Sequence, residues 1–155
     1  MPIHALVGHV VIITAAIASL LALVYAWRPR SRAGMRVPLV AATALNMALA
    51  VWAGSAGSAL LDDLERAAGG EGALPPTVRE HAHGSDALTL ASLVLLTAVL
   101  ALVWWLLSPR RTAGTGTVVA SVVLTACALA VVWFGAATLV DGLQAVWDQH
   151  STWRG

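Results

Sequence analysis

The chain has 155 residues, of which 59% are hydrophobic and 11% are charged, and its mean hydropathy is +0.80. Soluble globular domains carry about 25% charged residues, so the composition excludes an ordinary soluble domain. The formal net charge of +1 provides no excess of basic residues for binding nucleic acid, and we expect no nucleic-acid partner.

Four long apolar runs follow one another along the chain. They cover residues 5–27, 37–61, 87–107 and 117–140. A run of about 18 or more apolar residues is long enough to cross a hydrocarbon core of about 30 Å as a helix. The sequence therefore predicts an all-α, integral membrane four-helix bundle that forms a single domain over residues 1–155. We expect its helices at about residues 4–27, 37–62, 78–107 and 115–147.

The charged residues are divided between the two ends of this predicted bundle. The connections after the first and third helices carry six of the nine basic residues and no acid: Arg28, Arg30, Arg32, Arg36, Arg110 and Arg111. All eight acids and all five histidines fall on the other side. Because connections rich in arginine stay in the cytoplasm, we expect both termini outside. The predicted location is the bacterial inner membrane, which the chain crosses several times.

The histidines at the outer end are candidate metal ligands. His9 lies about one turn inside the first apolar run, and an ionisable residue at membrane depth suggests a functional site. We expect His9 to point into the bundle, with His83 or His81 as its partner and His4 as the alternative ligand. Imidazole is a common metal ligand near neutral pH. The simpler interpretation is that the shallower histidines are solvated.

Carboxylates near the same end are candidate supporting residues, because metal-bound histidines commonly donate to a carboxylate. The predicted supporting residues are Asp62, Asp86 and Asp141.

Each apolar run also carries a hydrogen-bonding residue near its middle: Thr14, Asn46, Thr97 and Thr125. Such groups usually bond to a neighbouring helix. Asn46 is the most costly of them to bury, so we expect it to have a partner inside the bundle. The small residues at 53–58 should face the same interior. Two tryptophans at membrane depth, Trp52 and Trp133, either pack in the core or line a flat cofactor.

The segment HALVGHVV, residues 4–11, resembles a motif of a known family. The motif is H-P-x-x-V-H-F-P, which begins the first helix in the bacterial four-helix membrane proteins of domain of unknown function family 2231. The two histidines match in kind and spacing, whereas Ala5, Val10 and Val11 replace the two prolines and the phenylalanine.

Later segments carry weaker resemblances to the same family. GSALLD at residues 57–62 is similar to the end of the family's second helix. His81 or His83 is similar to the histidine that precedes the family's third helix. QAVW at 144–147 is similar to the end of a G-H-S-G-A-x-x-V-W segment, whose histidine is replaced here by Val140. The resemblance implies a four-helix membrane fold. Some relatives join this module to a Rieske iron–sulfur domain, which implies a redox role.

Three functions remain open from the sequence. The first is a redox or accessory module that binds haem b or a transition metal at its outer end. The second is an accessory or structural subunit without a cofactor, and the third is a small proton-linked transporter. No nucleophile–base pair or phosphate-binding loop is recognisable, so no enzymatic activity is assigned. The expected partners are the lipid bilayer and either redox membrane proteins or a second copy of the chain.

The arginine distribution makes a prediction about topology. Reporter fusions after Arg32 and after Gly72 should give opposite sidedness, with the fusion after Arg32 in the cytoplasm, because basic connections resist translocation. Paired phosphatase and fluorescent-protein fusions measure this directly. Equal sidedness at the two positions would contradict the four-span topology.

Overall fold

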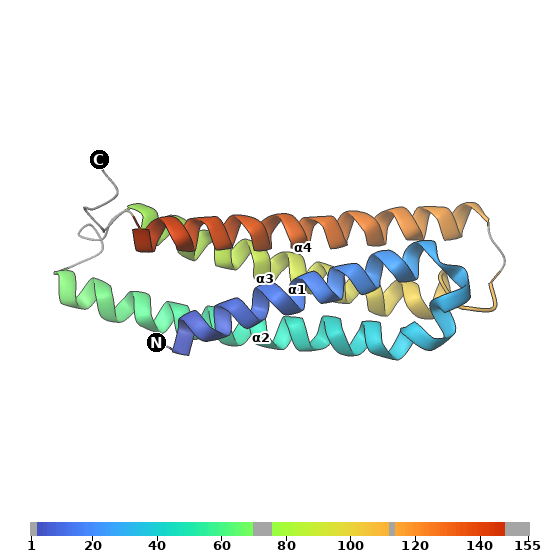
Figure 1. The fold of residues 1–155 in the computed structure, drawn as a ribbon, viewed down its shortest axis with the longest axis horizontal. Helices are drawn as coiled ribbons and strands as arrows, with labels where there is room; N and C mark the ends of the chain where they lie inside the picture. The colour runs from blue at the N-terminus through green and yellow to red at the C-terminus, as the bar shows by residue number, and fades with distance from the viewer. Residues whose placement is uncertain (1–2, 70–75, 112–113, 148–155) are drawn as a thin grey trace.

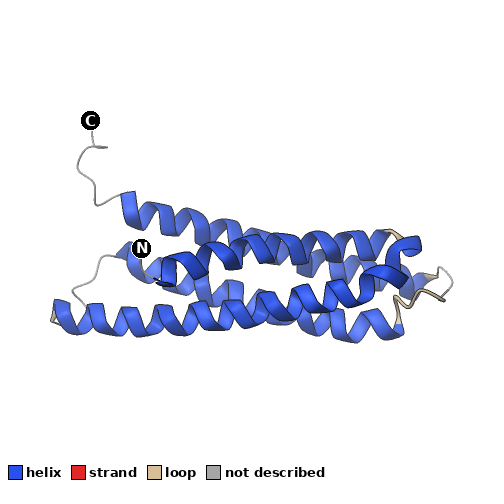
Figure 2. Cartoon of the chain, turned by 60° about the horizontal axis from the view of Figure 1, so that its bottom comes forward, coloured by secondary structure: helices blue, strands red, loops and turns tan. Residues whose placement is uncertain are grey.

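The computed structural model of the chain describes residues 3–69, 76–111 and 114–147. It consists of four long helices, α1 (Ile3–Trp27), α2 (Arg32–Ala68), α3 (Pro76–Trp105) and α4 (Thr115–Trp147). A short 3-10 turn, η1 (Pro29–Ser31), joins α1 to α2. The helices form an elongated antiparallel bundle in which α1, α2, α3 and α4 pack in a ring, each against the next and α4 against α1 (Figures 1 and 2). The predicted all-α four-helix fold is confirmed.

Four helical segments, one for each long helix, are long and apolar enough to cross a membrane, and the second of them also includes η1. These segments are Leu6–Trp27, Pro29–Ala67, Ser85–Trp105 and Thr115–Gln144. Many large apolar side chains lie on the outside of the bundle, including Leu20, Leu90 and Trp133. Such an outer surface suits lipid rather than water as the surrounding solvent. The structure thus indicates a multi-pass membrane protein in a lipid bilayer.

The second helix is longer at both ends than predicted. It spans residues 32–68, whereas the expected helix covered about residues 37–62. Hydropathy predicts only the part of a helix that lies in lipid. The helix can extend beyond that part where the following residues have high helix propensity. Beyond Leu61 the segment DDLERAA consists mainly of good helix formers, and Asp63 pairs with Arg66 one turn away at 2.8 Å. The helix ends at Gly69, whose φ of +89° is a left-handed cap conformation.

Small residues form the inward face of α1. Val7, Val11, Ala15, Ala18 and Ala22 recur every three or four positions and are all buried. Small side chains let neighbouring helix backbones approach closely, which is how helices associate in lipid.

Asn46 joins three helices near the middle of the bundle. Its side chain is 1% exposed, its Oδ1 lies 3.1 Å from the donor Thr14 Oγ1, and its Nδ2 donates to Ser92 Oγ at 3.0 Å. The Thr14 hydroxyl shares its one proton between Asn46 and the carbonyls of its own helix, which lie 3.0 Å away. We call these three residues, from α1, α2 and α3, the asparagine layer. The expectation that Asn46 is inward and partnered is confirmed, and Ser92 is a partner that sequence analysis did not identify.

The other mid-helix polar residues divide into two groups. Thr125 on α4 accepts a hydrogen bond from Trp27 Nε1 of α1 at 2.9 Å, as an interhelical role requires. Thr97 is exposed and donates to Leu93 O of its own helix at 2.8 Å, so the expected interhelical bond is wrong for this residue. Within residues 53–58, only Ala53 is buried, so that stretch faces the interior only in part.

A second buried polar cluster holds the turn between α1 and α2. The guanidinium of Arg32, 2% exposed, donates from Nε to Tyr25 O at 3.0 Å and from Nη2 to Ala26 O at 2.7 Å. Ser121 of α4 also donates to Ala26 O, at 2.9 Å, and the hydroxyl of Tyr25 donates to Leu107 O at 3.0 Å. Two of the last carbonyls of α1, those of Tyr25 and Ala26, are thereby satisfied by α2 and α4 in place of helical amides.

The asparagine layer predicts which polar residues stabilise the bundle. Asn46→Leu removes both bonds of the layer, and interhelical bonds in membranes contribute on the order of 0.6 to 2 kcal/mol. Thermal unfolding in detergent, followed by circular dichroism, should therefore show a lower midpoint. Ser55→Ala is the matched control, because Ser55 is exposed on the same helix and donates only to Trp52 O. Equal midpoints for Asn46→Leu and Ser55→Ala would contradict the structural role of the layer.

Candidate functional site

The candidate ligands lie toward the end of the bundle where α1 begins and α4 ends, which we call the acidic end (Figure 1). Their heights along the bundle can be measured from the asparagine layer, because its bonds set Thr14, Asn46 and Ser92 at one level. At a rise of about 1.5 Å per residue, His9 lies about 7.5 Å from the layer toward the acidic end. Asp86 lies at about 9 Å on the same scale.

His9 does not point into the bundle, which corrects the expectation from sequence. Its side chain is exposed, while Val7 and Val11, two residues away on either side, are 7% and 3% exposed. Each residue turns a helix by about 100°, so a residue two positions from both buried valines lies on the opposite side of α1. The pattern of small residues along α1 could have revealed this, because His9 shares its face with Ile13, which is 60% exposed.

Asp62 lies far from His9 along the bundle axis. It is 16 residues beyond Asn46 on α2, which places it about 24 Å from the layer. This part of α2 extends past the start of α1 (Figure 1). Asp62 is exposed there, next to the Asp63–Arg66 ion pair. The structure therefore does not bring His9 and Asp62 together.

Asp141 and Asp86 are nearer in height to His9. The bond between Trp27 and Thr125 fixes α4 against α1, and counting back from it sets Asp141 within about 3 Å of the height of His9. Asp141 is half-buried on α4, a neighbour of α1 in the ring. Asp86 is exposed on α3, which is diagonal to α1.

The remaining histidines are only partly described. His4 belongs to α1, and His81 and His83 belong to the first turns of α3, but their side chains lie outside the described part of the chain. Among the residues that the structure does describe, no three His, Cys, Asp or Glu side chains come together as a metal-binding group. A metal or haem site at these histidines remains a prediction.

The two tryptophans at membrane depth neither pack in the core nor line a cofactor, the two roles expected from sequence. Trp52 is 55% exposed and Trp133 is 71% exposed, so neither packs in the core. Both lie on the outer surface of the bundle, where a ring can contact lipid but cannot line an interior cofactor.

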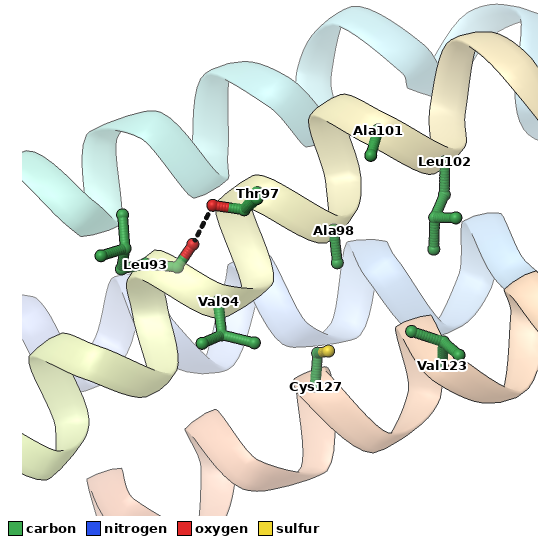
Figure 3. A pocket seen from close by; sticks show the side chains of 8 residues that line it. All are labelled: Leu93, Val94, Thr97, Ala98, Ala101, Leu102, Val123 and Cys127. Atoms are coloured by element: carbon green, nitrogen blue, oxygen red, sulfur yellow. Dashed lines mark hydrogen bonds between the residues drawn. The ribbon is translucent and has the colours of Figure 1, made fainter.

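A groove on the outer side of α3 and α4 is a feature that sequence analysis did not predict. It has a volume of about 430 Å³ and is lined by Leu93, Val94, Thr97, Ala98, Ala101, Leu102, Val123 and Cys127. Figure 3 shows Val94, Ala98 and Leu102 of α3 pointing toward the helix that carries Val123 and Cys127, α4. The hydroxyl of Thr97 is bonded to its own helix, so the groove is almost wholly apolar.

Comparisons with known proteins add no relative: no family model, curated protein or solved structure matches this chain. The resemblance of residues 4–11 to domain of unknown function family 2231 therefore remains a prediction.

The outward position of His9 can be tested with nitroxide labels in vesicles. After Cys127→Ala removes the native thiol, His9→Cys should give a label that is mobile and accessible to dissolved oxygen, because position 9 is exposed. Val11→Cys is the control and should give an immobile, protected label, because Val11 is 3% exposed. Electron paramagnetic resonance measures both properties, and a protected label at position 9 would restore an inward histidine.

Proposed function

We propose that this chain is a structural or accessory subunit of a membrane assembly that works without a cofactor. In this proposal the α3/α4 groove receives a transmembrane helix of another membrane protein. The observation that carries the proposal is the groove itself, a concave apolar surface among membrane-spanning segments.

Part of the groove lining has the small side chains of a helix-packing surface. Thr97 and Ala101 are four residues apart on α3, both are exposed, and Ala98 lies beside them. Small residues at this spacing allow two helices to approach closely in lipid, where close packing rather than the hydrophobic effect drives association. Inside the bundle such residues are covered by neighbouring helices, whereas here they face outward.

The interior of the bundle supports a structural role. The inward positions of α1 carry small residues in contact with other helices, and both ends of the Asn46 amide are used in interhelical bonds. A haem held across the bundle would need inward histidines, and His9 is on the outer face of α1. Asn46 and Ser92 therefore hold helices together, whereas Thr43 bonds to its own helix and Ser19 Oγ has no hydrogen-bond partner among the described residues.

A second candidate function is binding of a transition metal ion at the acidic end. The observation that favours it is the helical course of α3 from Pro76 onward, because two residues three positions apart in a helix, such as His83 and Asp86, are separated by about one turn. Imidazole and carboxylate are suitable ligands for zinc or copper. His9 is not required in this version of the site.

Photo-cross-linking tests the proposed docking groove. A benzophenone amino acid at Val94, which lines the groove, should form a discrete adduct with one other membrane protein in the native membrane. The same group at Leu20, 61% exposed on α1, is the control and should not form that adduct. Ala101→Phe, which fills the groove, should abolish the Val94 adduct, while Leu100→Phe outside the groove should preserve it.

The outcomes separate the candidates. An adduct of the mass of two chains would place a second copy in the groove and contradict a different membrane protein as its occupant. Equal adducts from Val94 and Leu20 would contradict the docking groove itself. Metal analysis and an absorption spectrum of the same purified protein address the second candidate. A stoichiometric metal that His83→Ala removes would favour the metal site over a subunit without a cofactor.

A further inference from the structure

We propose that the opposite end of the bundle binds the headgroup of an anionic phospholipid, and that Arg36 contacts its phosphate. This end, which we call the arginine end, contains the α1–α2 and α3–α4 connections. Its six arginines have no acid near them, because no Asp or Glu occurs at positions 1–61 or 87–140. The positive charge of the arginine end is therefore not neutralised by carboxylates of the protein.

The two arginines at the start of α2 differ in how their charge is stabilised. Arg32 and Arg36 are four residues apart and so lie on the same side of the helix. Arg32 makes two short bonds to the last carbonyls of α1, where the helix dipole is negative. These contacts fully account for Arg32 as a structural residue.

Arg36 is held in place but lacks a strong acceptor. Its guanidinium lies 5.1 Å from the centre of the Trp104 ring, within the range of a cation–π contact. Its Nη2 contacts Val103 O at 3.4 Å and Ser108 Oγ at 3.5 Å, both longer than the usual 2.7–3.2 Å. Its Nε is buried and has no hydrogen-bond partner among the described residues. The buried Nε is out of reach of an outside group, but the half-buried side chain holds Nη2 only by long contacts that a phosphate oxygen can replace.

The backbone of Arg36 lies at the edge of the hydrocarbon core, from which a long arginine side chain reaches the phosphates just outside it. It lies ten residues from Asn46 along α2, which is about 15 Å and half the thickness of a hydrocarbon core. Trp104 and Trp105 are exposed at a similar level, as tryptophans commonly are at the membrane interface. A guanidinium here meets phosphate oxygens, which its planar fork can bind with two parallel hydrogen bonds.

Neighbouring arginines favour a lipid that carries net negative charge. Arg110 and Arg111 are exposed on the connection after α3, directly beyond Ser108, which contacts Arg36. Basic residues near a membrane surface attract anionic lipids. They attract a zwitterionic lipid only weakly, because its headgroup carries no net charge. We therefore infer selectivity for phosphatidylglycerol over phosphatidylcholine.

The test measures thermal unfolding of the purified full chain in detergent while phosphatidylglycerol or phosphatidylcholine is added. Phosphatidylglycerol should raise the midpoint more than phosphatidylcholine does, because a ligand that binds only the folded state stabilises it. Arg36→Gln should weaken the apparent affinity for phosphatidylglycerol about fivefold or more, from the usual contribution of one basic residue at a membrane surface. Arg36→Lys, which keeps the charge but loses the planar fork, should lie between wild type and Arg36→Gln.

Arg66→Gln is the matched control, because Arg66 is an exposed arginine at the acidic end and its loss should not change the lipid preference. Inorganic phosphate at the same concentration should have no effect, and an equal effect would assign the site to free phosphate and overturn the lipid proposal. An unchanged preference in Arg36→Gln would also overturn it. If Arg36→Gln does not fold, the double variant Arg110→Gln/Arg111→Gln tests the proposal instead. It should lose part of the preference for phosphatidylglycerol over phosphatidylcholine, and an unchanged preference would overturn the proposed selectivity.

Discussion

A polar group within a bilayer must find its partner inside the protein, and Asn46 meets this requirement for three helices at once. Its amide accepts from Thr14 and donates to Ser92, so α1, α2 and α3 are fixed at one relative height. Lipid cannot satisfy a displaced amide, and any sliding of one helix would leave a donor or acceptor unpaired. The heights of the other groups along these three helices follow from this constraint.

Near the arginine end, a different interaction holds the fourth helix. Two of the last carbonyls of α1 are bonded by Arg32 of α2 and Ser121 of α4, and Trp27 donates to Thr125 of α4. A charged side chain buried among apolar helices is stable here because it faces the negative end of a helix. The same end leaves Nη2 of Arg36 with only long contacts, so structural and lipid-binding arginines lie one helical turn apart.

The described side chains that were candidates for binding a metal or cofactor lie on the surface of the bundle. His9 is exposed, Asp62 lies on the part of α2 that extends past α1, and Trp52 and Trp133 are on the outer surface. The described interior, in contrast, consists of apolar side chains, from small ones such as Ala18 to large ones such as Leu95 and Tyr25, with a few hydrogen bonds between helices. This division favours a protein that acts through its outer surfaces, by contact with another helix at the α3/α4 groove and with lipid headgroups at the arginine end.

Length and hydropathy alone were sufficient to predict four spanning helices, because a run of apolar residues in lipid has few alternatives to a helix. The inward position of Asn46 was also predictable, since its amide is too costly to leave in hydrocarbon. Sequence analysis did not identify Ser92 as its partner, nor the outward direction of His9. The small residues on the opposite face of α1 were a signal for the direction of His9. The pairing of Asn46 with Ser92 depends on the relative height of α2 and α3, which is set by contacts between helices. Tertiary structure alone determined which of the polar residues at similar depth meet, because only the packed bundle selects one rotation and one height for each helix.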